Sequence, residues 1–387
     1  MTTLSDKVIT SDFLSPTGDG SGLTNVPKPH RPVDVSGATP SLNVGTYNFF
    51  DQGVLSQDTT VSFTSVPEDA EWQYSYVAGV DSASAFDLAN ASYSGKSFSV
   101  TSQSPQPKSM YFNTEGTKMF VVDQSNQNVF EYDLSSEFDV STSVYSSNSF
   151  YVGSQDSSPQ GISFNTDGTS MFVVGNDNDN VFQYTLSTGF DISTASYASK
   201  SFSVTPQETV AIGIYFSPDG TKMFIVGYSD AVYQYTLSTG FDVSTASYDS
   251  KSLDVSAQES STTGVSFNTE GTTLIISGEN SDAVYQYTLS TGFDVSTASY
   301  ASKSFSVSSQ VSSSYGVNFS PDGTKMFIVG FDTDTIFQYT LAEAAALTLP
   351  TIVGTPSTPA VGDRVTYTFT TTDSGTTVNL NVEDIIQ

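Results

Sequence analysis

The stretch Gly213-Ile214-Tyr215-Phe216-Ser217-Pro218-Asp219-Gly220-Thr221-Lys222-Met223-Phe224-Ile225-Val226-Gly227, followed by Val232-Tyr233-Gln234-Tyr235-Thr236-Leu237, decides the fold of this 387-residue chain. It occurs in five copies, whose turn glycines are Gly116, Gly168, Gly220, Gly271 and Gly323. Successive turn glycines are 52, 52, 51 and 52 residues apart. A repeat of this length indicates a propeller or another repeat array.

Each copy contains four segments with the pattern of short strands. In the second copy these segments are residues 161–164, 171–174, 181–186 and 201–204. The turn Asn165-Thr166-Asp167-Gly168 joins the first two, and its glycine supplies the positive φ of a tight hairpin. The second segment is apolar at successive positions, so it should be covered on both faces. Four short antiparallel strands in each copy are typical of a propeller blade.

The fourth strand is out of step with the other three. The first copy of the fourth strand lies before the first complete set of the other three strands, and the last such set, at 315–341, has no fourth strand after it. The five copies of the fourth strand are marked by Phe98, Phe150, Phe202, Leu253 and Phe305. The N-terminal copy can complete the last blade, which would close the ring and remove two exposed edges. We therefore expect a five-bladed propeller over residues 86–342. A six-bladed ring, with residues 46–80 as the extra blade, is the alternative. It has less support, because Phe86-Asp87, at the end of the region before the repeats, is the only part of that region that keeps the repeat spacing.

The regions on either side of the repeats have a different composition. Residues 1–35 are rich in Gly, Pro, Ser, Thr and Asp, which indicates an extended arm or linker. Residues 36–85 contain three alternating segments, at 46–50, 60–64 and 72–77, and are expected to form a small β module. Residues 343–387 begin with a Pro-rich linker and end in a predicted hairpin of 365–369 and 377–382. Because a lone hairpin is marginally stable, it should pack on the N-terminal module or on another chain.

Composition restricts the class of protein and its partners. Ser, Thr, Tyr, Phe, Val and Gly are plentiful, which favours an all-β chain. Lys and Arg number 12 against 41 Asp and Glu, and the resulting charge of −29 repels nucleic acid and anionic lipid, so neither is an expected partner. The absence of Cys excludes disulfides and thiolate metal sites. The N-terminus lacks the apolar core of a signal peptide, and no apolar run is long enough to insert in a membrane.

Few residues are suited to catalysis or to metal binding. His30 is the single histidine and lies among prolines, which argues against a Ser-His-Asp or His-metal site. Glu131 stands where the other copies have Gln, and we interpret it as a single exposed acid. Residues 176–180 alternate oxygen-bearing side chains but lack the Gly and distal Glu of an EF-hand, so calcium is not expected. Other acids recur at one repeat position, which indicates a structural duty such as capping a turn; they are Asp139, Asp191, Asp242 and Asp294. We predict no enzyme, no cofactor and no metal.

The copies differ mainly in two sets of loops. One set joins the second and third strands, the other joins the fourth strand to the next blade, and both emerge on the same face of a four-stranded blade. The opposite face carries the nearly invariant Asp-Gly-Thr turns. Because the repeat is nearly identical in all copies, we do not expect it to determine binding specificity. We take the varied face as the candidate recognition surface. Tyr228 and Phe331 would be exposed aromatics suited to stacking on sugars, and drift among the copies is the alternative explanation. The candidate residues, one from each blade, are Asn126, Asp177, Tyr228, Glu279 and Phe331.

Two parts of the chain resemble known families. The repeat at 216–227 resembles the Asp-Gly repeats of YncE-like propellers, and with its tail at 233–248 it is similar to propeller repeats in virion proteins of marine bacteriophages. Residues 18–26 resemble a segment near the start of phage tail-fibre proteins. The resemblance implies a structural protein of the virion, a tail fibre or related appendage. Its N-terminal region would contact other virion proteins, and its propeller would face a glycan or protein receptor on the host.

Several functions stay open beside the viral one. A five-bladed glycan-binding or glycoside-hydrolase propeller is one alternative, and the hydrolase would need unrepeated carboxylates at the channel mouth. A lectin-like or scaffold protein of a marine bacterium is another. A homo-oligomer is compatible with all of these.

Overall fold

The structure is a computed structural model that describes residues 85–341 with their side chains. It also describes the backbone of nine strands outside that range. The chain divides into two units, Gly79–Ala345 and a second that combines Met1–Ala78 with Ala346–Gln387, and each is described by itself. Within the described residues, no helix has the length and apolar character needed to cross a bilayer.

The larger unit is a five-bladed β-propeller, and each blade is an antiparallel sheet of four strands. The first two blades are β8 (Pro107–Phe112), β9 (Lys118–Asp123), β10 (Asn128–Leu134) and β11 (Ser143–Tyr151), then β12 (Pro159–Phe164), β13 (Ser170–Gly175), β14 (Asn180–Leu186) and β15 (Ala195–Ser203). The next two are β16 (Ala211–Phe216), β17 (Lys222–Gly227), β18 (Ala231–Leu237) and β19 (Ala246–Asp254), then β20 (Thr262–Phe267), β21 (Thr273–Gly278), β22 (Ala283–Leu289) and β23 (Ala298–Ser306).

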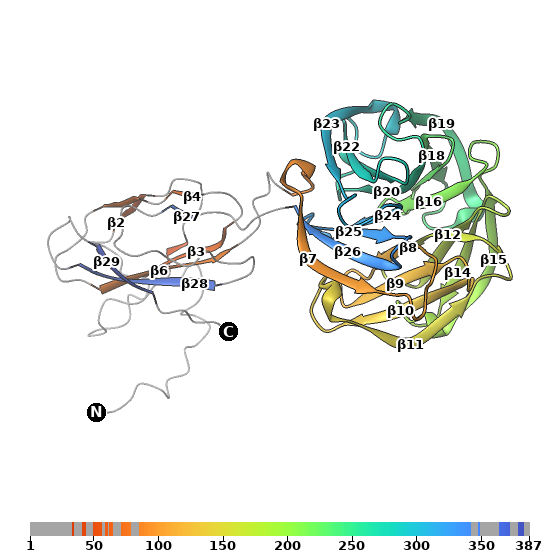
Figure 1. Cartoon of the computed structure of the whole chain (residues 1–387). Coiled ribbons are helices and arrows are strands. Elements are labelled where there is room, and N and C mark those ends of the chain that lie inside the picture. The colour runs from red at the N-terminus through yellow and green to blue at the C-terminus, as the bar shows by residue number, and fades with distance from the viewer. Residues whose placement is uncertain are drawn as a thin grey trace. The chain divides into compact units, whose positions relative to one another are not determined.

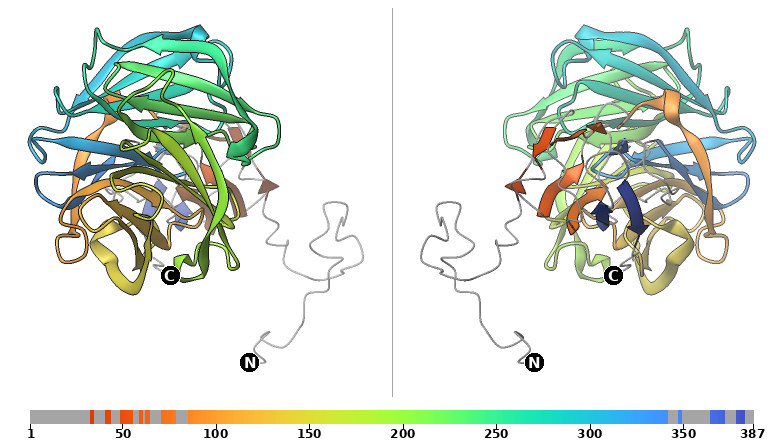
Figure 2. Two further views of the ribbon diagram at one scale, coloured as in Figure 1. Left: turned by 90° about the vertical axis from the view of Figure 1, so that its right-hand side faces the viewer. Right: turned by 90° about the vertical axis from the view of Figure 1, so that its left-hand side faces the viewer.

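The fifth blade combines the two ends of the propeller sequence. It consists of β24 (Ser314–Phe319), β25 (Lys325–Gly330), β26 (Thr335–Thr340) and, as its outer strand, β7 (Ser92–Ser99). β7 pairs antiparallel with β26, with Phe98 opposite Ile336. Figures 1 and 2 show the orange N-terminal strand beside the blue strands of the last blade. The predicted five-bladed ring with an N-terminal closing strand is confirmed, and the six-bladed alternative is wrong.

A short 3-10 helix precedes each outer strand and shows why the turn sequence is repeated. The helices are η2 (Leu88–Asn90), η3 (Val140–Thr142), η4 (Ile192–Thr194), η5 (Val243–Thr245) and η6 (Val295–Thr297). An Asp caps each one, as Asp139 accepts from Ser141 N at 3.1 Å, so the predicted capping role is confirmed. The Phe before each Asp adopts positive φ, for example Phe138 at 51°, and its ring covers the turn glycine, here Gly116 at φ 70°. A side chain on that glycine would collide with the ring.

Neighbouring blades are joined by polar contacts that recur around the ring. The Gln in the third strand of one blade accepts from the first N–H of the next blade's 3-10 helix, as Gln338 does from Val140 N at 3.1 Å. Glu131 occupies this position in the first blade, where it accepts from Ile192 N at 3.2 Å and pairs with Lys118 at 2.5 Å. Because Glu131 is 0% exposed, the interpretation as an exposed acid is wrong. Four Lys–Asp pairs add to these contacts: Lys96–Asp139, Lys200–Asp242, Lys251–Asp294 and Lys303–Asp87.

The first strands of the blades line a central channel, and apolar clusters lie between adjacent blades. β8, β12, β16, β20 and β24 are neighbours around the axis, and they occupy the centre of the ring in Figure 1. They approach closely because glycine occupies the third position of most of them. A Cβ on Gly264 would lie 2.6 Å from Val317 N of the next blade. The second strands are buried on both faces, as their apolar pattern predicts.

The smaller unit joins the two ends of the chain in one sheet. Its strands are β1 (Val33–Asp34), β2 (Ser41–Asn43), β3 (Phe49–Leu55), β4 (Thr59–Thr60), β5 (Ser62–Thr64), β6 (Glu71–Ala78), β27 (Leu347–Thr348), β28 (Arg364–Thr371) and β29 (Val378–Val382). The five-stranded sheet has the order β1-β3-β6-β28-β29, and the pairs β2-β5 and β4-β27 are separate. The C-terminal strands β28 and β29 pair with each other, and β28 also pairs with β6. His30 and the rest of the predicted arm before Val33 lie outside the described residues.

Candidate functional site

The central channel has two different ends. We call the end with the loops between second and third strands the loop end, and the end with the Asp-Gly-Thr turns the turn end. The first strand of each blade runs between them, and its second residue, which lies near the loop end, differs in every blade. These second residues are Lys108, Gln160, Ile212, Thr263 and Tyr315. Ile212 and Tyr315 are buried in one apolar cluster, so side chains from opposite blades meet at this end.

Three of the five predicted recognition residues converge at the loop end. Tyr228 Oη donates to Glu279 Oε2 at 2.8 Å, and Tyr315 Oη donates to the same oxygen at 3.1 Å. The prediction that Phe331 is exposed is wrong, because its ring is partly buried and packs on Tyr315 with the ring centroids 5.1 Å apart. Burial raises the pKa of both tyrosines, so their hydroxyls stay protonated and can donate to the Glu279 carboxylate. Tyr228 remains 42% exposed and presents an aromatic surface to solvent.

A lysine that the sequence analysis did not single out lies beneath this group. Lys108, on β8, is only 6% exposed, and its ammonium lies 4.0 Å from the Tyr315 ring centroid and 3.9 Å from that of Phe331. No ion pair or hydrogen bond of its Nζ occurs among residues 85–341. Burial lowers the pKa of Lys108 from 10.5 to about 8, although the carboxylates of Glu279 and Asp123 oppose this. The loop end thus holds a buried cation that packs against two aromatic faces and has no direct ion pair among the described residues.

Replacing Lys108 with Met is expected to stabilise the propeller at neutral pH by about 1–3 kcal/mol, because the buried ammonium carries a desolvation cost. The folded-state pKa, about 8, is below 10.5, so the unfolded chain binds more protons between these values. The stability of the wild type relative to Lys108→Met should therefore rise as the pH increases through this window, because the buried tyrosines, whose raised pKa values lower stability near pH 10, are present in both proteins. Urea unfolding at pH 7 and pH 10 measures both effects. A less stable variant at pH 7 would mean that the aromatic contacts outweigh desolvation.

The other two predicted residues do not join this group. Asn126 donates from Nδ2 to Gln103 O at 2.9 Å, and Asp177 accepts from Ser157 Oγ, so both hold their own loops in place.

The residue directly after the second strand is the one that reaches the next blade. In the first blade that residue is Gln124, whose Nε2 donates to Ser158 Oγ at 2.6 Å. Tyr228, Glu279 and Phe331 occupy the same position, so alignment on the end of the second strand would have selected Gln124 and Asn176 instead of Asn126 and Asp177.

Buried carboxylates at the loop end accept hydrogen bonds from backbone N–H groups. Glu259 accepts from Ser261 N at 2.9 Å and from Ser281 N at 3.2 Å, which joins the loop before β20 to the turn after β21. Asp123, at the end of β9, makes the equivalent connection in the first blade, between the loop before β8 and the turn after β9. It accepts from Gln106 N at 2.7 Å and from Asn126 N at 2.6 Å. Asp156 and Glu208 are buried and bonded in the manner of Glu259. Carboxylates engaged in this way are held in place as structural acceptors.

No family model matches the chain, and no curated protein matches it either. Among solved structures, a Bacteroides uniformis protein described as a "putative 6-phosphogluconolactonase" is 14% identical, and the match covers 60% of this chain and 68% of that one with a TM-score of 0.40. A functionally unknown protein from Desulfotomaculum acetoxidans is 11% identical, with 72% and 86% covered and a TM-score of 0.38. Similarities this low say nothing about what the chain binds.

The segment considered for calcium is a turn between β13 and β14. Asp179 accepts from Ala211 N at 3.2 Å, and Asn178 Nδ2 donates to Gln155 O at 3.3 Å. These oxygens and amides are thus used in contacts with neighbouring loops. Across residues 85–341, no three His, Asp or Glu side chains lie together in a way that could hold a metal ion.

Proposed function

We propose that this chain is a non-enzymatic structural protein of a bacteriophage virion, a tail fibre or related appendage, and that the loop end of its propeller is a contact surface. The partner would be a glycan or protein of the host surface or another protein of the particle. The observation that carries the contact surface is the convergence of Tyr228, Glu279 and Phe331, from three successive blades, over Tyr315 and Lys108. Tyrosine is enriched in binding interfaces and among the residues that carry most of their binding energy.

The viral assignment is supported by the resemblance of the repeats and of residues 18–26 to phage structural proteins. In this proposal the chain is attached to the virion through its N-terminal region. Mass spectrometry of purified virions tests this assignment, since a virion protein must be present in stoichiometric amounts. Absence of the chain from intact particles would overturn it.

The non-enzymatic part of the proposal is supported by the buried carboxylates, because those at the loop end accept backbone N–H groups. The alternative is a glycan-binding or glycoside-hydrolase propeller. Release of sugar from host surface polysaccharide by the purified chain would favour the hydrolase.

The double variant Tyr228→Ala/Phe331→Ala is expected to weaken binding to host cells or to the partner by about tenfold or more, since aromatic anchors carry much of the energy of an interface. Surface plasmon resonance or a cell-binding assay measures the loss. Tyr197→Ala is the matched control, because Tyr197 is 37% exposed near the start of the outer strand β15, at the turn end of the propeller. Equal binding by the double variant and the control would place the contact surface elsewhere.

A further inference from the structure

A cavity of about 240 Å³ occupies the channel at the turn end, opposite the proposed contact surface. Its wall contains the phenylalanines that end the five first strands: Phe112, Phe164, Phe216, Phe267 and Phe319. Exposed residues of the turns form its rim: Thr114, Thr166, Pro218, Thr269 and Pro321. Because the rim residues are exposed, the cavity is open to solvent.

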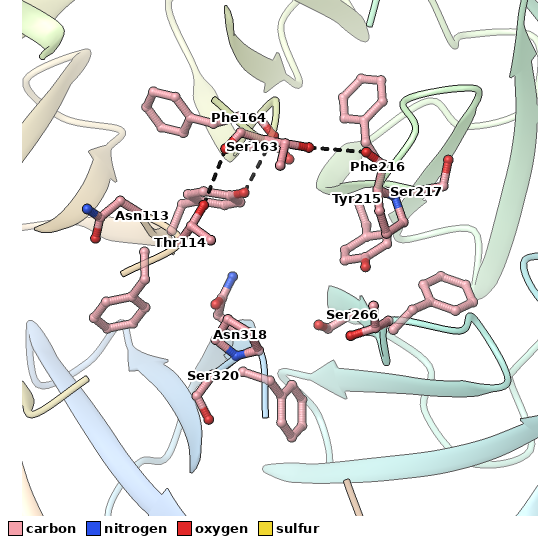
Figure 3. Close-up of a pocket in the computed structure, with 18 of the residues that line it drawn as sticks. Asn113, Thr114, Ser163, Phe164, Tyr215, Phe216, Ser217, Ser266, Asn318 and Ser320 are labelled. Atoms are coloured by element: carbon pink, nitrogen blue, oxygen red, sulfur yellow. Dashed lines mark hydrogen bonds between the residues drawn. The ribbon is translucent and has the colours of Figure 1, made fainter. Parts of the chain in front are cut away.

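The interior of the cavity differs from blade to blade, although the surrounding sequence is repeated. The fifth residue of each first strand lines it, and these residues are Tyr111, Ser163, Tyr215, Ser266 and Asn318. Figure 3 shows Tyr215, Ser266 and Asn318 projecting toward its centre from three blades. The fifth position of the first strand therefore varies between blades, although the phenylalanine that follows it is the same in all five, and it varies where a ligand would be contacted.

Four of the polar side chains that line the cavity have no hydrogen-bond partner among the described residues. The side chains of Ser163, Tyr215, Ser266 and Asn318 make no hydrogen bond to another described residue, yet none of them is sealed from solvent. Tyr111 Oη has only a 3.5 Å contact with Phe164 O. Burial raises the pKa of Tyr111 to about 12 and also raises that of Tyr215, so both hydroxyls are neutral. No charged side chain lines the cavity.

We propose that this cavity binds a neutral sugar ring, presented as the terminal residue of a glycan. A charged ligand would lose hydration without gaining an opposite charge. A purely apolar ligand would bury the hydroxyl and amide groups without partners, which is unfavourable. A neutral pyranose offers hydroxyls to Ser163, Ser266 and Asn318 and apolar C–H faces to the rings of Tyr111 and Tyr215. The volume also suits one ring, since it lies below the roughly 300–1,000 Å³ of sites for drug-sized ligands.

Isothermal titration of the full chain with neutral monosaccharides tests this proposal. Glucose, galactose, mannose, fucose and N-acetylglucosamine are the probes, used to about 10 mM so that a Kd of about 1 mM is detected. We expect at least one of them to bind with a stoichiometry of one per chain. Asn318→Leu, which keeps the side-chain size and removes the amide, should weaken that binding about tenfold. Ser266→Phe, which fills the cavity, should abolish it. Unchanged thermal unfolding of both variants shows that the propeller is intact.

The proposal goes beyond the contact surface at the loop end, and its test separates the two. Tyr228→Ala/Phe331→Ala should leave sugar binding unchanged, because those residues lie at the opposite end of the channel. Failure of the virion or cell-binding experiments would not affect this result. The site is overturned if none of the five sugars binds, if Asn318→Leu binds as tightly as wild type, or if glucuronate competes equally well with the neutral sugar.

Discussion

A chain that begins at Thr101, and so lacks β7, is expected to lose the cooperative unfolding transition of the propeller. Its last blade would have β26 as an exposed edge in place of the pairing with β7. The same deletion removes the Phe86 ring over Gly323, the bond from Leu88 N to Gln286 at 3.0 Å, and the Asp87 partner of Lys303. We expect a loss of at least about 5 kcal/mol, comparable with the whole stability of a typical domain.

Urea unfolding followed by near-ultraviolet circular dichroism measures this loss. A chain that begins at Gly79 is the control, because it keeps every strand of the propeller unit. A peptide of residues 85–100 added to the shorter chain should restore part of the stability. If the two truncated chains unfold at the same urea concentration, the N-terminal strand does not close the ring.

The second large effect is expected from Gly264→Ala, which should destabilise the propeller by at least about 3 kcal/mol. A Cβ at this position would lie 2.6 Å from Val317 N, a backbone atom of the neighbouring first strand. Backbone cannot move away as a side chain can, so the five first strands would have to separate. Every blade packs on two others, and the strain would spread around the ring.

Gly95→Ser is the matched control for this substitution. Gly95 has φ 76° and open space around its Cβ position, and the equivalent residues of the other blades, Ser147, Ser199, Ser250 and Ser302, have φ between 56° and 72°. Serine is thus already accepted in this conformation, and we expect a change below about 1 kcal/mol. If both variants lost a similar amount of stability, the effect at Gly264 would come from the loss of glycine's backbone freedom and not from a collision with the neighbouring strand.

Local sequence predicted those features that depend on short-range chemistry. Gly220 and its equivalents require positive φ, and Asp139 and its equivalents cap a 3-10 turn, so both are visible in any single copy. The offset of Phe98 relative to the triplets also predicted the closing strand. Glu131 was misjudged because its burial depends on Lys118 and on Ile192 of the next blade, which the pattern of one copy does not contain.

The sequence by itself determined the strands, the turns, the blade count and the way the ring closes, because these follow from periodicity and from residues adjacent in the chain. Only the tertiary structure decided which side chains meet at the two ends of the channel. Lys108 meets Tyr315 and Phe331 across more than 200 residues, and Tyr111, Tyr215 and Asn318 enclose one cavity from three blades. Such groups arise from the curvature of the closed ring, which sets neighbours across the axis and leaves no trace in the spacing of any one repeat.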